Sequence, residues 1–409
     1  MSATTVVAAD SLGFDPRRLA RIRPRMQQYV DSGNFAGITT LLARRGRVVH
    51  FEHAGVRDKS TQAPLDASTV FRIYSMTKPI VCAALMTLYE EARFHLFEPL
   101  AKYLPPFAKV KVWNGEGRPL ADPLRPILIR DLFTHTAGLT YNFLEDTPVS
   151  AMYQEAGLFS RPSDTLEFIV AELARLPLAY QPGSRWHYSM SIDVLAHLIQ
   201  VLSGRPLQDF LEERIFLPLG MAATGFSVPA HTRANVAAMY GRADIAFHTF
   251  TQALNKPLGP LDVAPTYPAD NTSTWARGGS GLFSTASDYF RFAQMLLNRG
   301  QLDGARILSP AVAELMHTNH LPSNMLPLMI GILPFLGYGF GLGSRVLLSP
   351  AESCLPGSVG EFGWGGAANT YYWVDPKMEI VGVFMTQLMY NIEFPRQDFQ
   401  VLAYQALVA

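Results

Sequence analysis

Cysteine and charge are both scarce in this chain of 409 residues. Only two cysteines occur, Cys82 and Cys354, and two are too few for a disulfide framework. Cys82 lies in an apolar helical segment, where a small core residue is expected rather than a reactive thiol. Charged residues make up 17% of the sequence, below the usual quarter, whereas 48% of residues are hydrophobic. This composition predicts one large core or two packed subdomains.

Neither sign of charge predominates, because 34 basic residues face 34 acidic ones. Nucleic acids and anionic membranes are bound by basic faces, so we expect neither as a partner. The first residues, MSATTVVAAD, lack the basic start and apolar stretch of a signal peptide, which favours a cytoplasmic protein. Met325–Gly343 carries no charge, but its prolines and glycines suit a loop leading into a strand better than a membrane-spanning helix.

Segments with strand character lie near both ends of the chain, and helical segments fill its middle. Helices are predicted at 15–31, Met76–Ala92, Asp164–Arg175, Ser191–Ser203, Leu207–Phe216, Ser287–Arg299 and from about Asp398. Strands are predicted at Gly37–Ala43, Val48–Gly55, Val70–Tyr74, Tyr338–Val346, Glu361–Trp364, Thr370–Val374 and Ile380–Thr386. This order predicts an α/β (α+β) subdomain of residues 1–105 and 275–409, with an antiparallel sheet flanked by helices, and a mainly helical subdomain at 106–274.

One short motif brings a nucleophile and a base together. Ser75-Met76-Thr77-Lys78 places a hydroxyl and an amine three residues apart at the start of a predicted helix, so both lie on one face. The helix N-terminus favours an alkoxide there, and a neutral lysine is one way to activate a serine. Taken alone, the pair is equally consistent with an exposed lysine beside a capping serine.

Two later segments add candidate site residues. Tyr188, in Trp186-His187-Tyr188-Ser189-Met190, can accept the serine proton as a phenolate if a cation such as Lys78 stabilises that form. Its ordinary role would be that of a core aromatic with one hydrogen bond. Phe362-Gly363-Trp364-Gly365-Gly366-Ala367 has glycines in a strand context. Such glycines indicate either close approach by a ligand or backbone, or a β-bulge.

The order and separation of these three segments resemble the motifs of class C β-lactamases and penicillin-binding carboxypeptidases, and are most similar to those of the family VIII esterases. The supporting segments are Leu132–Leu139, Gln181–Gly183, Gly278–Thr285 and Tyr338–Gly343, so that the resemblance covers about residues 15–405. It implies a β-lactamase/transpeptidase-like fold with the active site at the junction of the two subdomains. It implies no metal or other cofactor, and a structural packing role for His135.

The resemblance also implies a role for each motif residue. Ser75 would be the acylated nucleophile, Lys78 its proton partner, and Tyr188 the general base that later protonates the leaving alcohol. The oxyanion hole would consist of the backbone N–H groups of Ser75 and Ala367.

Two departures from the β-lactamase pattern concern the substrate. Met190 stands where an asparagine would bind a substrate amide, and Trp364 stands where a lysine would meet a β-lactam carboxylate. We expect both to contact substrate, together with Gly365 and Gly366. The loss of two polar contacts favours an apolar ester over an anionic amide.

These features together predict a serine carboxylesterase that hydrolyses short to medium acyl esters of small molecules through an acyl-enzyme. Three alternatives remain open: an acyltransferase, a β-lactamase or D-amino-acid peptidase using the same serine, and a binding module that keeps the fold without turnover. The chain has no Gly-x-Ser-x-Gly segment, which weighs against the nucleophile elbow of the α/β-hydrolases.

Overall fold

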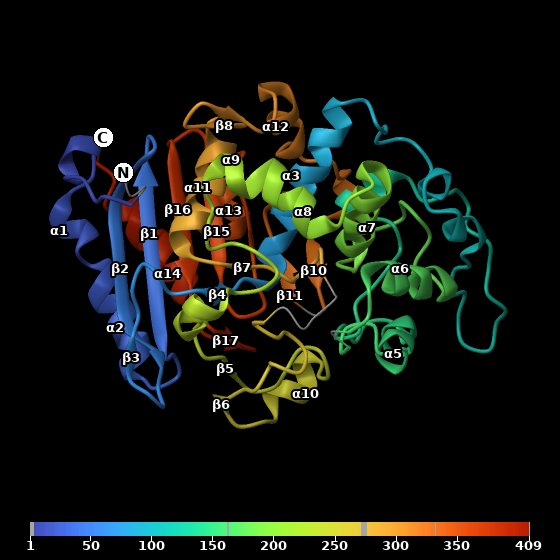
Figure 1. Cartoon of the computed structure of the whole chain (residues 1–409), viewed down its shortest axis with the longest axis horizontal. Coiled ribbons are helices and arrows are strands. Elements are labelled where there is room, and N and C mark those ends of the chain that lie inside the picture. Colours follow the sequence, from blue (N-terminus) through green and yellow to red (C-terminus); the bar gives the residue numbers. More distant parts are fainter. Residues whose placement is uncertain (1–3, 162, 271–275, 332, 409) are drawn as a thin grey trace.

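The computed structural model describes residues 4–161, 163–270, 276–331 and 333–408, and an antiparallel sheet of eight strands forms its centre (Figure 1). In spatial order the strands are β12 (Tyr338–Phe340), β13 (Arg345–Leu347), β14 (Phe362–Gly365), β15 (Tyr371–Asp375), β16 (Ile380–Met385), β1 (Gly37–Arg44), β2 (Arg47–Asp58) and β3 (Ala63–Pro64). β1 pairs with β16, Thr39 opposite Met385, so the two ends of the chain meet in mid-sheet. The predicted α/β fold with an antiparallel sheet flanked by helices is therefore confirmed.

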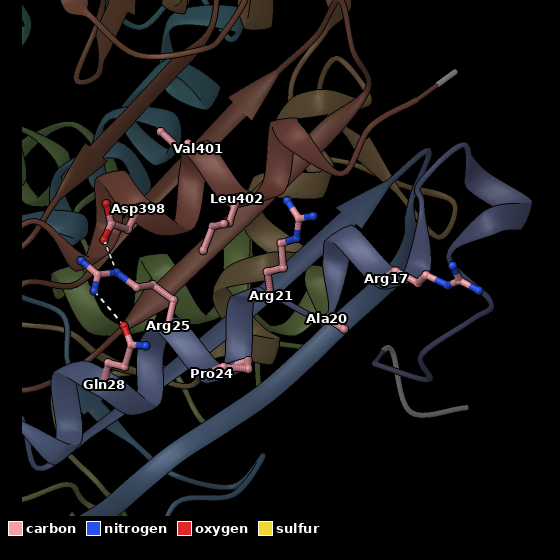
Figure 2. A pocket seen from close by; sticks show the side chains of 9 residues that line it. All are labelled: Arg17, Ala20, Arg21, Pro24, Arg25, Gln28, Asp398, Val401 and Leu402. Carbon is pink, nitrogen blue, oxygen red and sulfur yellow. Dashed lines mark hydrogen bonds and ion pairs between the residues drawn. The ribbon is translucent and has the colours of Figure 1, made fainter.

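Three helices cover one face of the sheet: α1 (Pro16–Leu19), α2 (Ile22–Asp31) and α14 (Pro395–Gln405). Phe399 of α14 packs edge to face on Trp373, with ring centroids 5.2 Å apart. Figure 2 shows the outer side of this layer, where Arg25 donates to Asp398 at 2.6 Å and to Gln28 at 2.9 Å. An apolar contact inside and an ion pair outside thus join the first helices to the last.

The other face of the sheet carries α11 (Ala286–Leu297), which contacts β1, β15 and β16, and α3 (Thr77–Glu90) packs among other helices. Every residue of α3 from Thr77 to Leu88 is buried. Cys82 is therefore a core residue, as predicted, and burial raises the pKa of its thiol far above the usual range. A helix buried on all sides holds its first turn firmly, and that turn carries Lys78.

Helices dominate the middle of the chain, and α5, α6 and α7 among them lie to the right in Figure 1. They are α4 (Ile129–Phe133), α5 (Pro148–Glu155), α6 (Leu166–Arg175), α7 (Ser191–Ser203), α8 (Leu207–Leu211), α9 (Leu217–Leu219) and α10 (Phe250–Leu254), with a π-helical turn at Glu212–Phe216. Two short strands also occur here, β5 (Tyr240–Gly241) and β6 (Gly259–Pro260), and β5 pairs with β17 (Leu388–Met389). The subdomain limits drawn from the sequence stay a prediction.

Short pairs complete the structure: β4 (Phe71–Arg72) with β7 (Phe283–Ser284), β8 (Gln301–Leu302) with β9 (Ala305–Arg306), and β10 (Leu328–Ile330) with β11 (Leu333–Phe335). The remaining helices are α12 (Pro310–Met316) and α13 (Pro350–Ser353). The uncharged segment Met325–Gly343 contains the β10–β11 hairpin and then β12. Within the described ranges, the model contains no helix with the length and apolarity needed to cross a membrane.

Three predicted elements differ from the structure. The single helix expected at 15–31 is two helices, because Pro24 has no N–H to donate to Ala20 and the chain turns before α2. The strand expected at Val70–Tyr74 is reduced to β4, since the chain turns into a 3₁₀ helix at Tyr74. The strand expected at Tyr338–Val346 is the β12–β13 hairpin, closed by the Gly341 N–H donating to the Ser344 carbonyl at 2.8 Å.

Candidate active site

Ser75 lies at the turn between β4 and α3, and that turn presents its hydroxyl. Tyr74 has φ of +42°, a left-handed conformation that is unusual for a side chain of this size. The Met76 N–H donates to the Ile73 carbonyl at 3.0 Å, which tightens the turn. Ser75 itself is half-buried while its neighbours are buried. A strained backbone that exposes one hydroxyl is typical of a functional position.

Lys78 is fully buried one turn into the helix, and its amine lies beside the serine. Its Nζ donates to Ser75 Oγ at 3.1 Å and to the Gly279 carbonyl at 2.7 Å. The same Nζ lies 4.7 Å from the ring centroid of Tyr188 and 5.2 Å from that of Tyr141. Among the residues that the model describes, no carboxylate forms an ion pair with this amine. Its surroundings are therefore one carbonyl, one hydroxyl and two aromatic faces.

Tyr188 lies in a loop that leads into α7 and makes a second side-chain contact with Ser75. Its hydroxyl donates to Ser75 Oγ at 2.7 Å. The buried ring lies against His135 and Trp364, with centroids 4.9 Å and 5.5 Å away. His135 is held by a 3.2 Å hydrogen bond between its Nδ1 and the hydroxyl of Ser189, and burial holds its pKa well below the usual range. The position of His135 thus agrees with the packing role suggested for it.

A carboxylate that the sequence analysis missed is connected to the lysine by two hydrogen bonds through Gly279. Asp193, in the first turn of α7, is buried and accepts from the Gly279 N–H at 3.0 Å. The carbonyl of Gly279 in turn accepts from Lys78. Burial raises the pKa of Asp193, and the nearby positive charges of Lys78 and Arg277 oppose that rise. Asp193 is the only acid in the otherwise largely apolar Ser191–Ser203, and that contrast was the available signal.

A side chain at position 279 would displace its neighbours, because the segment passes so close to them. A Cβ there would lie 2.5 Å from Asp193 Oδ2 and 2.9 Å from the Tyr141 hydroxyl, both shorter than any real contact. The Gly278–Thr285 segment, singled out in the sequence for its resemblance alone, therefore has a physical role. It carries Gly279, whose N–H donates to Asp193 and whose carbonyl accepts from Lys78.

The end of β14 approaches the serine turn equally closely. A Cβ on Gly366 would lie 2.3 Å from the Ile73 carbonyl, and the Thr370 hydroxyl donates to that carbonyl at 3.2 Å. The N–H groups of Ser75 and Ala367 make no hydrogen bond to backbone within the described residues. Two unengaged donors from adjoining segments match what an oxyanion hole needs.

A cavity of about 540 Å³ opens at this point. Its wall includes six predicted site residues: Ser75, Tyr188, Trp364, Gly365, Gly366 and Ala367. The rest is largely apolar and includes Phe143, Ile245, Ile330, Leu333, Phe335, Leu336 and Phe394. Leu333, Leu336 and Phe394 are about half exposed or more, which is unusual for large apolar side chains, and they form an apolar entrance.

Met190 is a predicted site residue that the cavity wall does not include. Its side chain is fully buried, and its N–H donates to the Thr140 carbonyl at 3.1 Å just before α7 begins. The contact of Met190 with substrate therefore stays a prediction, which this cavity does not support. Trp364 does lie on the wall, and its buried indole N–H has no hydrogen-bond partner within the described residues.

Metal-ligating side chains do not gather in this region. Within the described ranges, no group of three or more histidine, cysteine, aspartate and glutamate side chains is arranged to hold a metal ion. The groups around Ser75 that can take part in chemistry are an amine, a phenol and backbone N–H donors.

Known proteins are similar to this chain along almost its whole length. The family model described as Beta-lactamase matches residues 22–407. Protein Rv1367c of Mycobacterium tuberculosis is 36% identical over 369 residues, 88% of each chain, and Esterase EstB of Burkholderia gladioli is 28% identical over 389 residues, 91% of each. The solved structure of EstCE1, a hydrolase with promiscuous acyltransferase activity, has a TM-score of 0.80 at 28% identity and covers 96% of this chain and 99% of its own. The chain therefore belongs to the Beta-lactamase family.

Proposed function

We propose that this protein is a serine carboxylesterase with Ser75 as its nucleophile. The observation that carries the proposal is the pair of hydrogen bonds on Ser75 Oγ, from Lys78 Nζ at 3.1 Å and from the Tyr188 hydroxyl at 2.7 Å. A serine in contact with both an amine and a phenol has a route for losing its proton. Relatives named as esterases, EstB among them, support ester hydrolysis over the other chemistries of the family.

The proposed reaction has two halves. The reaction starts from the phenolate form of Tyr188, which the Lys78 ammonium stabilises. The phenolate oxygen takes the proton of Ser75 Oγ, and Oγ attacks the ester carbonyl carbon. The N–H groups of Ser75 and Ala367 hold the resulting oxyanion. When the tetrahedral species collapses, the bond to the alcohol breaks and Tyr188 protonates the departing oxygen. Water then attacks the acyl-enzyme by the reverse route and releases the acid and free Ser75.

The cavity supports esters with apolar groups of short to medium length. Each buried methylene contributes about 0.8 kcal/mol, so kcat/KM should rise over the first few carbons and fall when the cavity is full. Trp364 on the wall supplies apolar area where the β-lactamase pattern has a cation. We therefore expect β-lactams to be poor substrates.

Acyl transfer to an alcohol is the second candidate, favoured by the apolar entrance at Leu333, Leu336 and Phe394. An alcohol held there would compete with water for the acyl-enzyme. The related hydrolase EstCE1 combines both activities. Assignment to family VIII, which rests on the motif resemblance, and a cytoplasmic location are further parts of the proposal.

One experiment tests the main proposal. Release of 4-nitrophenol from 4-nitrophenyl butyrate should show a burst equal to the enzyme concentration or steady turnover, and Ser75→Ala should show neither. Mass spectrometry should find the butyryl group on a peptide that contains Ser75. Full activity in the alanine variant would refute the assignment. Addition of a competing alcohol measures how much of the acyl group is transferred instead of hydrolysed.

A further inference from the structure

Asp193 is a buried carboxylate that the proposed reaction does not use. Its side chain is 1% exposed and does not line the cavity, so a substrate bound there does not contact it. Oδ1 accepts from the Gly279 N–H at 3.0 Å, whereas Oδ2 is buried without a hydrogen-bond partner within the described residues. A buried carboxylate with one unsatisfied oxygen is costly unless a nearby positive charge offsets its own.

Lys78 supplies a positive charge on the other side of Gly279. Its amine is fully buried, and Nζ donates to the Gly279 carbonyl at 2.7 Å, so one glycine contacts both charged groups with its backbone. Burial raises the pKa of Asp193, and the charge of Lys78 is the strongest influence that lowers it, ahead of the Gly279 hydrogen bond and of Arg277. Because electrostatic attraction is mutual, the carboxylate stabilises the ammonium as much as the ammonium stabilises the carboxylate.

The fold fixes the separation of these two charges. Asp193 occupies the first turn of α7, Lys78 occupies the first turn of α3, and the two helices contact each other. The bare Cα of Gly279 lets the carboxylate come close, because a Cβ there would lie 2.5 Å from Asp193 Oδ2. The carboxylate is thus held against the same residue that receives the lysine proton donor.

The other titratable groups around Lys78 bring no second negative charge. Tyr188 and Tyr141 present ring faces, with centroids 4.7 Å and 5.2 Å from Nζ. Burial, together with the charge of Lys78, holds the pKa of His135 well below the usual range, so its ring is neutral at neutral pH. On α3 itself, burial raises the pKa of the Cys82 thiol, which is therefore neutral as well.

Buried acids elsewhere in the described chain have partners of their own. Arg277, the other cation that acts on Asp193, also has Asp244 near it. The three further buried acids are Asp131, Glu361 and Asp375, which are held by Arg125, Arg345 and Tyr404 respectively. Asp193 is therefore the buried carboxylate whose charge complements that of Lys78.

From this arrangement we propose that Asp193 is a positioning residue of the reaction, which through Gly279 holds Lys78 as an ammonium directed at Ser75 Oγ and the ring of Tyr188. The inference rests on the proposed function and goes beyond it. In the acylation step the Tyr188 phenolate takes the Ser75 proton while Oγ forms its bond to the ester carbon, and Lys78 keeps its three protons. No proton passes to Asp193, whose charge keeps the ammonium from giving one up.

Asp193→Asn tests the charge alone, because the amide oxygen can still accept from the Gly279 N–H. Hydrolysis of 4-nitrophenyl butyrate should have a kcat about tenfold to a hundredfold lower, with KM within about threefold of wild type, since Asp193 does not contact substrate. Without the negative charge, Lys78 and Tyr188 lose their protons more readily, so the pH profile of kcat should move to lower pH by about half a unit or more. Asp193→Ala removes both the charge and the hydrogen bond and should show the same shift.

Asp288→Asn is the matched control. Asp288 likewise occupies the first turn of a helix, α11, and burial raises its pKa. It accepts from the Ala223 N–H at 2.8 Å and from the Thr224 hydroxyl at 3.0 Å, and it lies outside the cavity wall. This variant loses a carboxylate of the same kind without affecting Lys78, so it should change neither kcat nor the pH profile.

Thermal unfolding gives a second test that does not need activity. Lys78→Met leaves the carboxylate without its opposite charge, and Asp193→Asn leaves the ammonium without one, so each variant should be strongly destabilised. The double variant leaves neither charge behind and should melt at a higher temperature than either single variant. Should Asp193→Asn alone not fold, the double variant should fold.

The outcomes separate this inference from the proposed function. A pH profile of Asp193→Asn that coincides with the wild-type profile would make Asp193 a structural residue and overturn the inference, and so would an unchanged kcat. Additive losses of stability in the double variant would also overturn it, because the two charges would then be independent. A wild-type protein that does not hydrolyse the ester would instead overturn the esterase function, and the unfolding comparison would still decide whether the charges are paired.

Discussion

Tyr188→Phe separates chemistry from packing at this site. The substitution removes one hydroxyl, and with it the 2.7 Å hydrogen bond to Ser75 Oγ, while the ring keeps its contacts with His135 and Trp364. The cost in stability should be that of one hydrogen bond, about 0.5–1.5 kcal/mol. The cost in turnover should be much larger, because the phenol is the proposed carrier of the proton to the leaving alcohol. General acid–base groups contribute about 10²–10⁴-fold, so kcat should fall by that factor.

The assay is steady-state hydrolysis of 4-nitrophenyl butyrate together with thermal unfolding of the same preparations. Tyr141→Phe is the matched control, because its ring also lies near Lys78 Nζ, at 5.2 Å, but its hydroxyl makes no hydrogen bond to Ser75. It should retain kcat to within about tenfold. If Tyr188→Phe loses less than tenfold, the base must be Lys78 alone or a water, and the proposed role of the phenol is wrong.

Four further outcomes are expected. Ser75→Ala should reduce esterase activity to a trace without changing the melting temperature by more than a few degrees. Asp193→Asn should lower kcat more than it raises KM and should shift the pH profile of kcat, because a charge near Lys78 is removed; an unshifted profile would leave Asp193 a purely structural role. Burial raises the pKa of Glu361 from 4.5 to about 7, so the folded state binds more protons than the unfolded state between those pH values. Stability should therefore fall as pH rises through this window, and Glu361→Gln should flatten the dependence of melting temperature on pH. Nitrocefin should give a lower kcat/KM than 4-nitrophenyl butyrate, and the reverse order would favour the β-lactamase alternative.

The central residues of the site were predictable because short-range geometry controls them. Ser75 and Lys78 are one helical turn apart, so their contact follows from the start of α3. The role of Tyr188 could be predicted only from the order of the motifs along the chain, since no local rule places it beside Ser75. Strands β14, β15 and β16 were predicted to within one residue at each end, because their apolar and glycine pattern has few alternatives.

The missed features depend on contacts between distant parts of the chain. Gly279 and Asp193 are joined by a hydrogen bond across 86 residues. Its donor is a backbone N–H, which every residue except proline has, so the sequence does not indicate it. Met190 is two residues from Tyr188 in the sequence, yet it is fully buried just before α7 and does not line the cavity, a difference that the sequence does not indicate.

The pairing of β1 with β16 has a consequence for synthesis on the ribosome. Ser75 leaves the ribosome early, but the central strand that its subdomain needs is translated about 300 residues later, roughly 15 to 60 s at ordinary rates of elongation. Until then β1 has an open edge, and edges of this kind invite pairing with other nascent chains. Through most of this interval Ala367, the second predicted donor of the oxyanion hole, has not yet been translated. Enzymatic activity should therefore appear only when translation is almost finished, and ribosome-bound chains stalled before β16 should be inactive and prone to aggregate.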